Sequence, residues 1–399
     1  MSRLLINGRW VDGESSQPLT DKYAGRVYGE MAVASSAQID EAIGAARRAA
    51  DTVRMEPYAR YQALTGAARI IESRMRQFVD LLRDEAGFTR ADSENEVRRC
   101  AQTLELSGEE AKRLVGDLIP MAAGRGVKDR LGFTVRAPLG GICAITPFNS
   151  PLNTLAHKVG PALAGGNSVI IKPSTFTPLA AVELCKALID AGVPGELLTL
   201  LHGPGGSLGR QLLADPRIAY YAFTGSTQVG REIQQAAGLR GTQLELGSIA
   251  STIVCHDADI EMAIPKIINA GFRKAGQVCT SVQRLFVDRR IAPAFVPRLV
   301  EAVRATRVGD PADPRTVIGP MISEHHARRA ASWVDEAVSQ GARLLTGGTL
   351  RGRVFEPTVL QDVRSDMRVV CEEIFAPVLS IIEFDDIAEA VAGANASDF

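Results

Sequence analysis

The sequence predicts an α/β protein built from two doubly wound parallel-sheet domains and one projecting strand. Three observations support this prediction: a helix-patterned opening, and then two successive sets of short apolar runs that alternate with amphipathic runs. Short apolar runs separated by helical patterns are typical of parallel strands whose sheet is covered by helices on both faces. The chain has 399 residues, 46% of them hydrophobic, and is therefore long enough for more than one core.

The opening part of the chain is expected to be helical from residue 35 to about residue 116. "SSAQ" from Ser35 resembles a capping box, and apolar residues follow it at helical spacing: Ile39, Ile43, Ala46 and Ala50. The next segment, 119–139, has little helical periodicity. Its alternating stretch "GFTVRA" at 132–137 predicts a strand that projects from the body of the protein.

The first alternating set begins at Gly140. Its expected strands are "GICAI", "SVIIK", "LLTLL" and "AYYAF", and its expected helices cover 152–164, 178–191, 207–214 and 227–237. Because ligands of such sheets bind outside the carboxyl ends of the strands, the loops "TPFNSP", "KPST", "HGPGG" and "FTGST" should share one edge. A second set begins near Gly247, where "STIVC", "RLFVD", "ARLLTGG" and "VLSII" alternate with helical patterns at 259–275, 291–306 and 323–340.

Charge and composition argue against several classes of protein. Acidic and basic residues are interspersed and sum to a net charge of −1, which argues against nucleic-acid binding and against binding to a membrane surface. The opening "MSRLLINGRWVDG" has no signal-peptide pattern, and no later apolar run is long enough to span a bilayer, so a cytoplasmic protein is expected. Its expected partners are small molecules or further copies of the same chain.

Two glycine-rich turns are candidates for binding a phosphate. At Gly225 and Ser226 an apolar strand turns into a helix, which directs unpaired backbone N–H groups at an anion. The spacing from Gly225 to Gly230 is that of a P-loop, but the lysine and hydroxyl that should follow are missing. "GPGGSLG" at 203–209 does not fit the dinucleotide fingerprint GxGxxG either. The pattern alone leaves a phosphate site and an ordinary strand-to-helix turn equally open.

Cys279 lies in the small, polar stretch "AGQVCTS" at 275–281. Four roles are open to such a cysteine: core residue, metal ligand, half of a disulfide, or nucleophile. The six cysteines form no CxxC pair, and the five histidines form no HxxxH or Cys/His cluster. We therefore expect neither a metal site nor a disulfide framework, which leaves core residue and nucleophile open.

Six motifs occur in a defined order along the chain: "TPFNSP" at 146–151, "KPST" at 172–175, "FTGST" at 223–227, "LELGS" at 244–248, "GQVC" at 276–279 and "EEIFAPV" at 372–378. In this order they resemble the NAD(P)-dependent aldehyde dehydrogenases, and the resemblance runs from "INGRWVDG" to the last residue. It implies a dinucleotide-binding domain formed by 1–118 and 140–246, an oligomerisation arm at 119–139, and a catalytic domain at 247–399.

The resemblance implies three catalytic residues. Cys279 is the nucleophile, whose thiolate attacks the aldehyde carbonyl and gives a thiohemiacetal and then, after hydride leaves, a thioester. Asn149 donates to the oxyanion, and Glu245 is the base that activates water for hydrolysis. From local sequence alone, Asn149 would be an Asx-turn residue and Glu245 a solvated strand residue. The apolar neighbours Leu244 and Leu246 predict that this segment is at least partly buried, which would tend to raise the pKa of a carboxyl there.

NAD or NADP is the cofactor that the resemblance implies. The implied contacts are Lys172 for the adenine ribose, Gly225 and Ser226 for the pyrophosphate, Glu373 and Phe375 for the nicotinamide ribose, and Thr146 and Phe148 in "TPFNSP". Thr175 stands where many NAD-preferring members carry a glutamate that binds the ribose 2′-hydroxyl and repels a 2′-phosphate. A carboxylate that would repel the 2′-phosphate of NADP is therefore absent at this position.

The implied substrate is a small polar or anionic aldehyde, such as a semialdehyde or a lactaldehyde. Arg273 matches a position that helps to hold the substrate carboxylate in succinate-semialdehyde dehydrogenases, whereas the partner arginine of those enzymes is replaced by His157. A solvated arginine is the alternative interpretation of Arg273.

Two other functions stay open at this point. In a CoA-acylating dehydrogenase, CoA instead of water would resolve the thioester, and the presence of Glu245 argues against that hypothesis. A non-catalytic cofactor-binding chain is the third hypothesis, because family members continue past the equivalent of Phe399 with the rest of the catalytic domain and a strand that pairs across subunits. The resemblance implies a homodimer or homotetramer when that segment is present.

Overall fold

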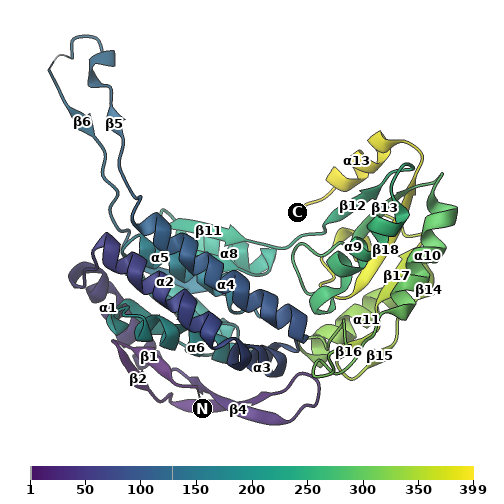
Figure 1. Ribbon diagram of the computed structural model, residues 1–399, viewed down its shortest axis with the longest axis horizontal. Helices are drawn as coiled ribbons and strands as arrows, with labels where there is room; N and C mark the ends of the chain where they lie inside the picture. Colours follow the sequence, from purple (N-terminus) through teal and green to yellow (C-terminus); the bar gives the residue numbers. More distant parts are fainter. Residues whose placement is uncertain (1, 128) are drawn as a thin grey trace.

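A computed structural model describes residues 2–127 and 129–399 of the chain. The chain forms two bodies, each built around one β-sheet, and a long hairpin projects from the first body (Figure 1). The first sheet uses strands from Leu4 to Glu245, and the second uses strands from Ser251 to Phe384. The connection between the sheets therefore falls at 246–250, around the predicted domain boundary near Gly247, and the assignment of functions to the two domains stays a prediction.

The opening segment holds four short strands that the sequence pattern did not reveal: β1 (Leu4–Ile6), β2 (Arg9–Val11), β3 (Ser15–Thr20) and β4 (Val27–Val33). Strands β1 and β2 extend the first sheet in antiparallel fashion, and β3 pairs with β4 as a hairpin. At the tip of this hairpin the carbonyl of Asp21 accepts a hydrogen bond from Arg353 of the second body at 3.1 Å. Strands β1 and β2, with three residues each, are too short to show a clear alternation.

Helices follow, as expected: α1 (Ser36–Thr52), α2 (Pro57–Ser73), α3 (Met75–Ala86) and α4 (Arg90–Ala111). The capping box is present, because Ser35 Oγ accepts from the Gln38 N–H at 3.1 Å while Gln38 Oε1 accepts from the Ser35 N–H at 3.0 Å. Gly87 ends α3 in the left-handed conformation, with a φ of 71°. Helix α4 then runs for 22 residues and carries Glu96 and Arg99, two residues that matter for the site.

The first sheet has the strand order β11-β10-β7-β8-β9-β1-β2, and its first five strands are parallel. These strands are β7 (Gly141–Ile145), β8 (Ser168–Lys172), β9 (Leu198–Leu200), β10 (Tyr220–Thr224) and β11 (Gly241–Glu245). The helices between them are α5 (Asn153–Ala164), α6 (Pro178–Asp190), α7 (Arg210–Ala214) and α8 (Thr227–Ala237). The predicted helix at 207–214 begins three residues later than expected.

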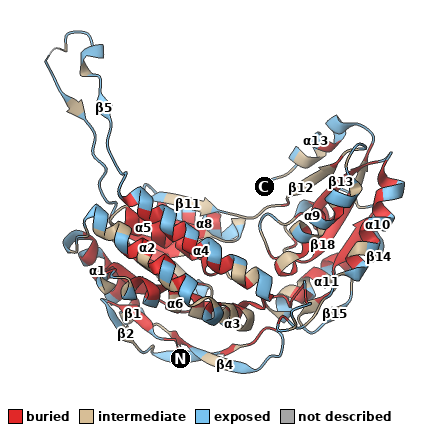
Figure 2. Cartoon of the chain, viewed as in Figure 1, coloured by how far each residue is buried: buried red, intermediate tan, exposed pale blue. Residues whose placement is uncertain are grey.

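Both faces of this sheet are covered, because alternate side chains of its strands enter different cores. Ile142 and Ala144 of β7 pack with helices α2 to α6, whereas Cys143 between them packs with α1, α7 and α8. The apolar run "GICAI" is therefore buried on both sides, as a doubly wound sheet requires (Figure 2).

The second sheet has the strand order β12-β13-β18-β17-β14, with only β14 antiparallel. Its strands are β12 (Ser251–Val254), β13 (Arg284–Asp288), β14 (Arg343–Thr346), β17 (Thr358–Gln361) and β18 (Val378–Phe384), and a small hairpin of β15 (Leu350–Arg351) and β16 (Val354–Phe355) lies beside it. Its helices are α9 (Ile260–Phe272), α10 (Ala292–Ala305), α11 (Glu324–Ser339), α12 (Arg368–Cys371) and α13 (Ile387–Asn395).

The projecting segment is a hairpin of β5 (Leu118–Ile119) and β6 (Gly132–Phe133). The strand predicted at 132–137 is therefore shorter than expected, and Lys128 of the predicted arm lies outside the described residues. Its apolar side chains face solvent over most of the hairpin: Leu118, Leu131, Phe133 and Val135. The role of this arm in oligomerisation stays a prediction. In 2–127 and 129–399, no helix combines the length and apolarity needed to cross a membrane.

Candidate active site

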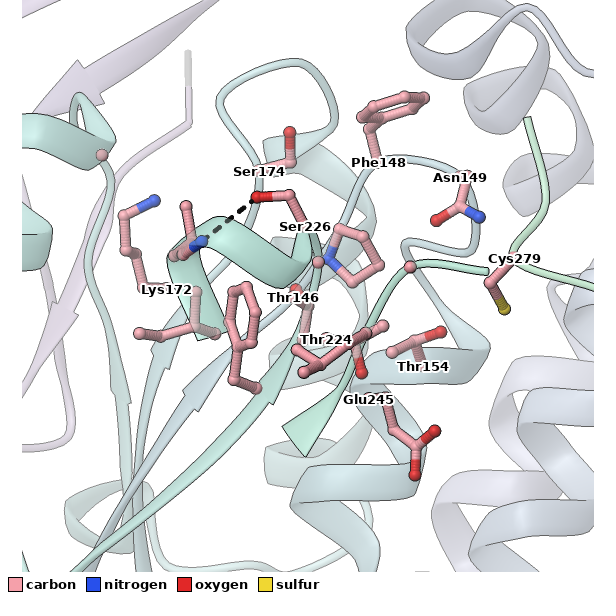
Figure 3. Close-up of a pocket in the computed structure, with 18 of the residues that line it drawn as sticks. Thr146, Phe148, Asn149, Thr154, Lys172, Ser174, Thr224, Ser226, Glu245 and Cys279 are labelled. Atoms are coloured by element: carbon pink, nitrogen blue, oxygen red, sulfur yellow. Dashed lines mark hydrogen bonds between the residues drawn. The ribbon is translucent and has the colours of Figure 1, made fainter. Parts of the chain in front are cut away.

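The loops that follow the parallel strands of the first sheet line a single cavity of about 1030 Å³, together with side chains of the second body. That volume is at the upper end of the roughly 300–1000 Å³ usual for small-molecule sites. Every site residue predicted from the sequence lines it except Arg273. In the view of Figure 3, Lys172 and Ser174 lie toward one end of the cavity and Asn149 and Cys279 toward the other.

The cysteine loop follows α9 through a tight turn. The helix was expected to continue to residue 275 but ends at Phe272, because Lys274 and Ala275 have φ values of 52° and 54°, in the left-handed region. Gly276 continues this conformation, and a Cβ there would lie 2.2 Å from the carbonyl oxygen of Ala376. Only glycine fits that position, so "AGQVC" is shaped by its close contact with the segment around residue 376.

Cys279 is an exposed residue that borders the cavity. Partial burial of its thiol is the main cause that raises its pKa, and the carboxylates of Glu373 and Glu245 raise it further. Hydrogen bonds from the backbone N–H groups of Cys279 and Thr280 act in the opposite direction. The buried cysteines Cys143 and Cys185 have pKa values raised to about 12 by burial, so they are poor candidates for a nucleophile.

Asn149 is buried in the loop after β7, and its backbone carbonyl oxygen accepts a hydrogen bond from Lys274 Nζ at 2.9 Å. Within 2–127 and 129–399 its side-chain amide makes no hydrogen bond, which leaves that donor available to a ligand. An uncharged amide can stabilise a developing oxyanion without losing a proton.

Glu245 is the last residue of β11 and lies at the cavity. Its neighbours Leu244 and Leu246 are half-buried, as predicted for this segment, but the Glu245 side chain itself, at the end of the edge strand β11, is exposed. Its Oε1 accepts from Gln243 Nε2 at 3.1 Å, and Gln243 Oε1 accepts from Lys158 Nζ at 3.3 Å. Burial is the main cause that lowers the pKa of Lys158 to about 8, and Glu245 partly opposes it. The hydrogen bond from Gln243 thus orients the Glu245 carboxylate, which stays accessible from the cavity.

The other end of the cavity has the features of a dinucleotide site. Ser226 caps α8 by accepting a hydrogen bond from the Val229 N–H at 3.4 Å, and Gly225 lets the turn pass close to Phe223, whose ring would lie 2.5 Å from a Cβ. The hydroxyls of Thr146 and Thr224 are buried and make no hydrogen bond within the described chain. Burial lowers the pKa of the Lys172 ammonium, which has only a 3.4 Å contact to the Pro173 carbonyl.

Thr175 lines the cavity, as predicted. One further group, the exposed Arg210 at the start of α7, lines it too and was missed from the sequence. Arg210 makes no ion pair with any residue in 2–127 or 129–399. A solvent-exposed arginine has no signature in local sequence, so only the fold could identify it.

Aromatic side chains from both bodies meet at the cavity. Phe148 contacts Phe176, His326 and Phe375 edge to face, with ring centroids 5.8 to 5.9 Å apart. Glu373 Oε1 accepts from the Ser248 N–H at 3.1 Å, which ties "EEIF" to the connection between the sheets. Phe375 itself has a φ of 52°, so its position is fixed by these contacts and not by its own backbone preference.

The predicted substrate residues are only partly brought together. His157 on α5 lines the cavity, and its Nε2 lies 3.4 Å from the Thr103 hydroxyl. Burial, followed by the nearby Arg99 and Lys158, lowers the pKa of His157, so its ring is neutral at pH 7. Arg273 caps the end of α9 outside the cavity, near Asp92. Arg99 of α4, which the sequence analysis missed, lines the cavity instead.

Comparison with known proteins identifies this set of loops. The profile of the aldehyde dehydrogenase family matches residues 10–399. The chain belongs to this family. The predicted family, fold class and enzyme class are confirmed. A 3-sulfolactaldehyde dehydrogenase of Priestia aryabhattai is 41% identical over 396 residues, which span 99% of this chain and 83% of that protein.

Solved aldehyde dehydrogenase structures superpose closely on the chain. An NADP-dependent glyceraldehyde-3-phosphate dehydrogenase from Bacillus halodurans, solved with NADP, has a TM-score of 0.96 and 33% identity, covering 100% of this chain and 84% of its own. PnpE, solved with nicotinamide adenine dinucleotide, has a TM-score of 0.95 and 33% identity, covering 100% of this chain and 83% of its own. Members of the family that resemble this chain thus use either dinucleotide, in agreement with the predicted cofactor.

Proposed function

We propose that this aldehyde dehydrogenase oxidises a small aldehyde with a second, anionic group to the carboxylate, using NAD or NADP. The observation that supports this proposal most is the convergence of Cys279, Asn149, Glu245 and Arg99 on one cavity. The first three groups can carry out the chemistry, and Arg99 can select the substrate. Relatives with such substrates include the 3-sulfolactaldehyde dehydrogenase and an NADP-dependent succinate-semialdehyde dehydrogenase of Escherichia coli, 33% identical over 403 residues.

In the proposed reaction the Cys279 thiolate attacks the aldehyde carbon, and the carbonyl oxygen becomes an oxyanion. The Asn149 amide and the Cys279 backbone N–H donate hydrogen bonds to that oxygen. NAD(P), when bound, would supply the acceptor for the hydride, and the re-formed carbon–oxygen double bond would leave Cys279 as a thioester. Glu245 then removes a proton from water, the hydroxide attacks the thioester, and the carbon–sulfur bond breaks to release the carboxylate.

The residues of the cavity fit NAD(P). The first turn of α8, capped by Ser226, presents backbone N–H groups to a pyrophosphate, and the unpaired hydroxyls of Thr146 and Thr224 need partners. Lys172 lacks a strong partner and can bind ribose hydroxyls. Thr175 adds no negative charge, and Arg210 supplies a positive one in the same cavity, so a 2′-phosphate can be accommodated.

Arg99 is the group proposed to bind the anionic end of the substrate. Its side chain is exposed in the cavity and forms no ion pair within 2–127 and 129–399. His157 is neutral, so it can contribute a hydrogen bond but not a charge. A guanidinium can bind a carboxylate or a sulfonate through two parallel hydrogen bonds.

Steady-state kinetics test this proposal. We expect the chain to reduce NAD(P) with succinate semialdehyde and with 3-sulfolactaldehyde, and Arg99→Ala to raise KM for both by roughly tenfold to a hundredfold, the value of a lost charged hydrogen bond. KM for uncharged propionaldehyde should stay within about twofold. Cys279→Ala should abolish activity with all three aldehydes.

Arg98→Ala is the matched control, because Arg98 is adjacent on α4 and its guanidinium is paired with Glu94 at 2.7 Å, outside the cavity. Equal effects of Arg99→Ala on charged and uncharged aldehydes would contradict the assignment of the anion site. Reduction that depends on CoA would assign thioester resolution to CoA, and cofactor binding without turnover would support the non-catalytic hypothesis.

A further inference from the structure

A buried ion pair lies directly behind the proposed oxyanion site. Lys274 Nζ lies 2.8 Å from Glu96 Oε2, and the two side chains are only 5% and 3% exposed. The ammonium also donates to the Asn149 carbonyl oxygen at 2.9 Å and lies 4.3 Å from the centre of the Phe88 ring. The three directions of the ammonium are therefore occupied by a carboxylate, a carbonyl oxygen and a ring face.

The Glu96 carboxylate of this pair also accepts hydrogen bonds through its other oxygen. Glu96 Oε1 accepts from the Ser150 hydroxyl at 2.7 Å and from the Asn153 N–H, at the start of α5, at 2.9 Å. Burial alone would raise the pKa of Glu96, but Lys274 and these hydrogen bonds outweigh it and lower the pKa. Glu96 therefore stays ionised at neutral pH and holds the loop that carries Asn149 at two points.

The pair also holds a strained turn in the second body. Lys274 and the following Ala275 are left-handed residues that are not glycine, and they lie five and four positions before Cys279. Such a conformation persists only when its surroundings fix it. Asp92, one turn before Glu96 on α4, also lies near Lys274, which acts to lower the pKa of its carboxyl against the larger, raising effect of burial. Helix α4 thus holds the side chain of Lys274 through Glu96.

The two proposed oxyanion donors come from different bodies: Asn149 follows β7 of the first sheet, and Cys279 belongs to the second body. We propose that the Glu96–Lys274 pair is a positioning device that sets Asn149 against the cysteine loop and so aligns the two donors. This inference rests on the proposed roles of Cys279 and Asn149. Neither Glu96 nor Lys274 lines the cavity, so both act through Asn149 and not on the substrate.

Two reactions of Cys279 separate alignment of the donors from general structural damage. With p-nitrophenyl acetate, the Cys279 sulfur attacks the ester carbonyl, an oxyanion forms, and the carbon–oxygen bond to p-nitrophenolate breaks. With iodoacetamide, the sulfur displaces iodide from a saturated carbon, and no oxyanion forms. Mass spectrometry of the Cys279 peptide measures both rates without the signal of exposed Cys371.

The test variant is Glu96→Gln/Lys274→Met, which removes both charges and leaves none buried alone. We expect acylation of Cys279 by p-nitrophenyl acetate to slow by about tenfold or more. The rate should not fall further than it does when an oxyanion donor is deleted. Alkylation by iodoacetamide should stay within about twofold. In an Asn149→Ala background the same double substitution should cause little further loss, because the donor that it positions is already gone.

Glu85→Gln is the matched control. Glu85 is also a buried carboxylate that accepts N–H groups at the start of a helix, those of Leu179 and Ala180 in α6, but it does not contact Asn149. It should leave both rates nearly unchanged. An unchanged acylation rate in the test variant, an equal loss in both reactions, or a full further loss in the Asn149→Ala background would each overturn the inference. Failure of the proposed function is distinguishable, because either the unsubstituted chain would then oxidise no aldehyde or Cys279→Ala would still oxidise aldehydes.

Discussion

The two ends of the cavity are built in different ways. The cofactor end, formed by Lys172, Thr175, Arg210, Gly225 and Ser226, comes entirely from the first body. The catalytic end combines Asn149 and Glu245 of that sheet with Cys279 and Glu373 of the second body. On the proposed roles of these residues, binding of the dinucleotide pyrophosphate and adenosine is a property of one body, whereas the chemistry depends on how two bodies are aligned. Substitutions at one end should leave the function of the other largely intact.

The largest effect within the catalytic end should distinguish its two proposed steps. Asn149→Ala should slow formation of the thioester, because it removes an oxyanion donor, whereas Glu245→Gln should slow only hydrolysis, because it removes the base. We expect steady-state turnover to fall on the order of a hundredfold in both variants. Rapid-mixing kinetics should then show a burst of NAD(P)H in Glu245→Gln and none in Asn149→Ala.

Dissociation constants for NADP, measured by fluorescence, serve as the control for these two variants. They should change by less than about twofold, because the adenosine and pyrophosphate contacts lie at the other end. A Glu245→Gln enzyme whose burst is absent would show that Glu245 acts before the thioester forms.

Much of this site could be predicted from the sequence because it depends on the order of strands and loops along the chain. Parallel strands such as "GICAI" and "SVIIK" agree with β7 and β8 residue for residue, and loops after such strands must share one edge. The features that were missed depend on contacts distant in sequence. The exposure of the Glu245 side chain was missed because the position of β11 at the sheet edge is set by strand order and not by the apolar neighbours of Glu245.

The same limit applies to the arginines and to the cysteine turn. Arg99 and Arg210 are ordinary exposed residues of two helices, and only the fold places them in the cavity. Lys274 and Ala275 have no sequence preference for left-handed backbone, so the end of α9 could not be located from its helical pattern. This turn is fixed by contacts of Lys274 with α4 and of Gly276 with residue 376, which are far away in sequence.

A smaller effect should be confined to the cofactor end. Arg210→Ala should raise KM for NADP by about tenfold and leave KM for NAD within about twofold, because only NADP presents a 2′-phosphate to the guanidinium. Thr175→Glu should shift the ratio of kcat/KM further toward NAD, since its carboxylate accepts a 2′-hydroxyl and repels a phosphate. Arg231→Ala on α8 is the control, because Arg231 does not line the cavity. Unchanged ratios in both variants would assign cofactor choice to other residues.

The smallest expected effect concerns the charge around the thiol at the catalytic end. The pKa of Cys279 is raised first by burial and then by Glu373, so the thiolate fraction is small at neutral pH and rises with increasing pH. Alkylation by iodoacetamide should therefore accelerate through the alkaline range, with a midpoint above that of an ordinary thiol, near 8.5. Glu373→Gln removes a negative charge that disfavours the thiolate, so the midpoint should fall. Glu372→Gln is the matched control, because the adjacent Glu372 acts on Cys371 and is absent from the cavity lining. A midpoint that moves equally in both variants would show that the bulk charge of this segment, and not the placement of Glu373 at the cavity, controls the thiol.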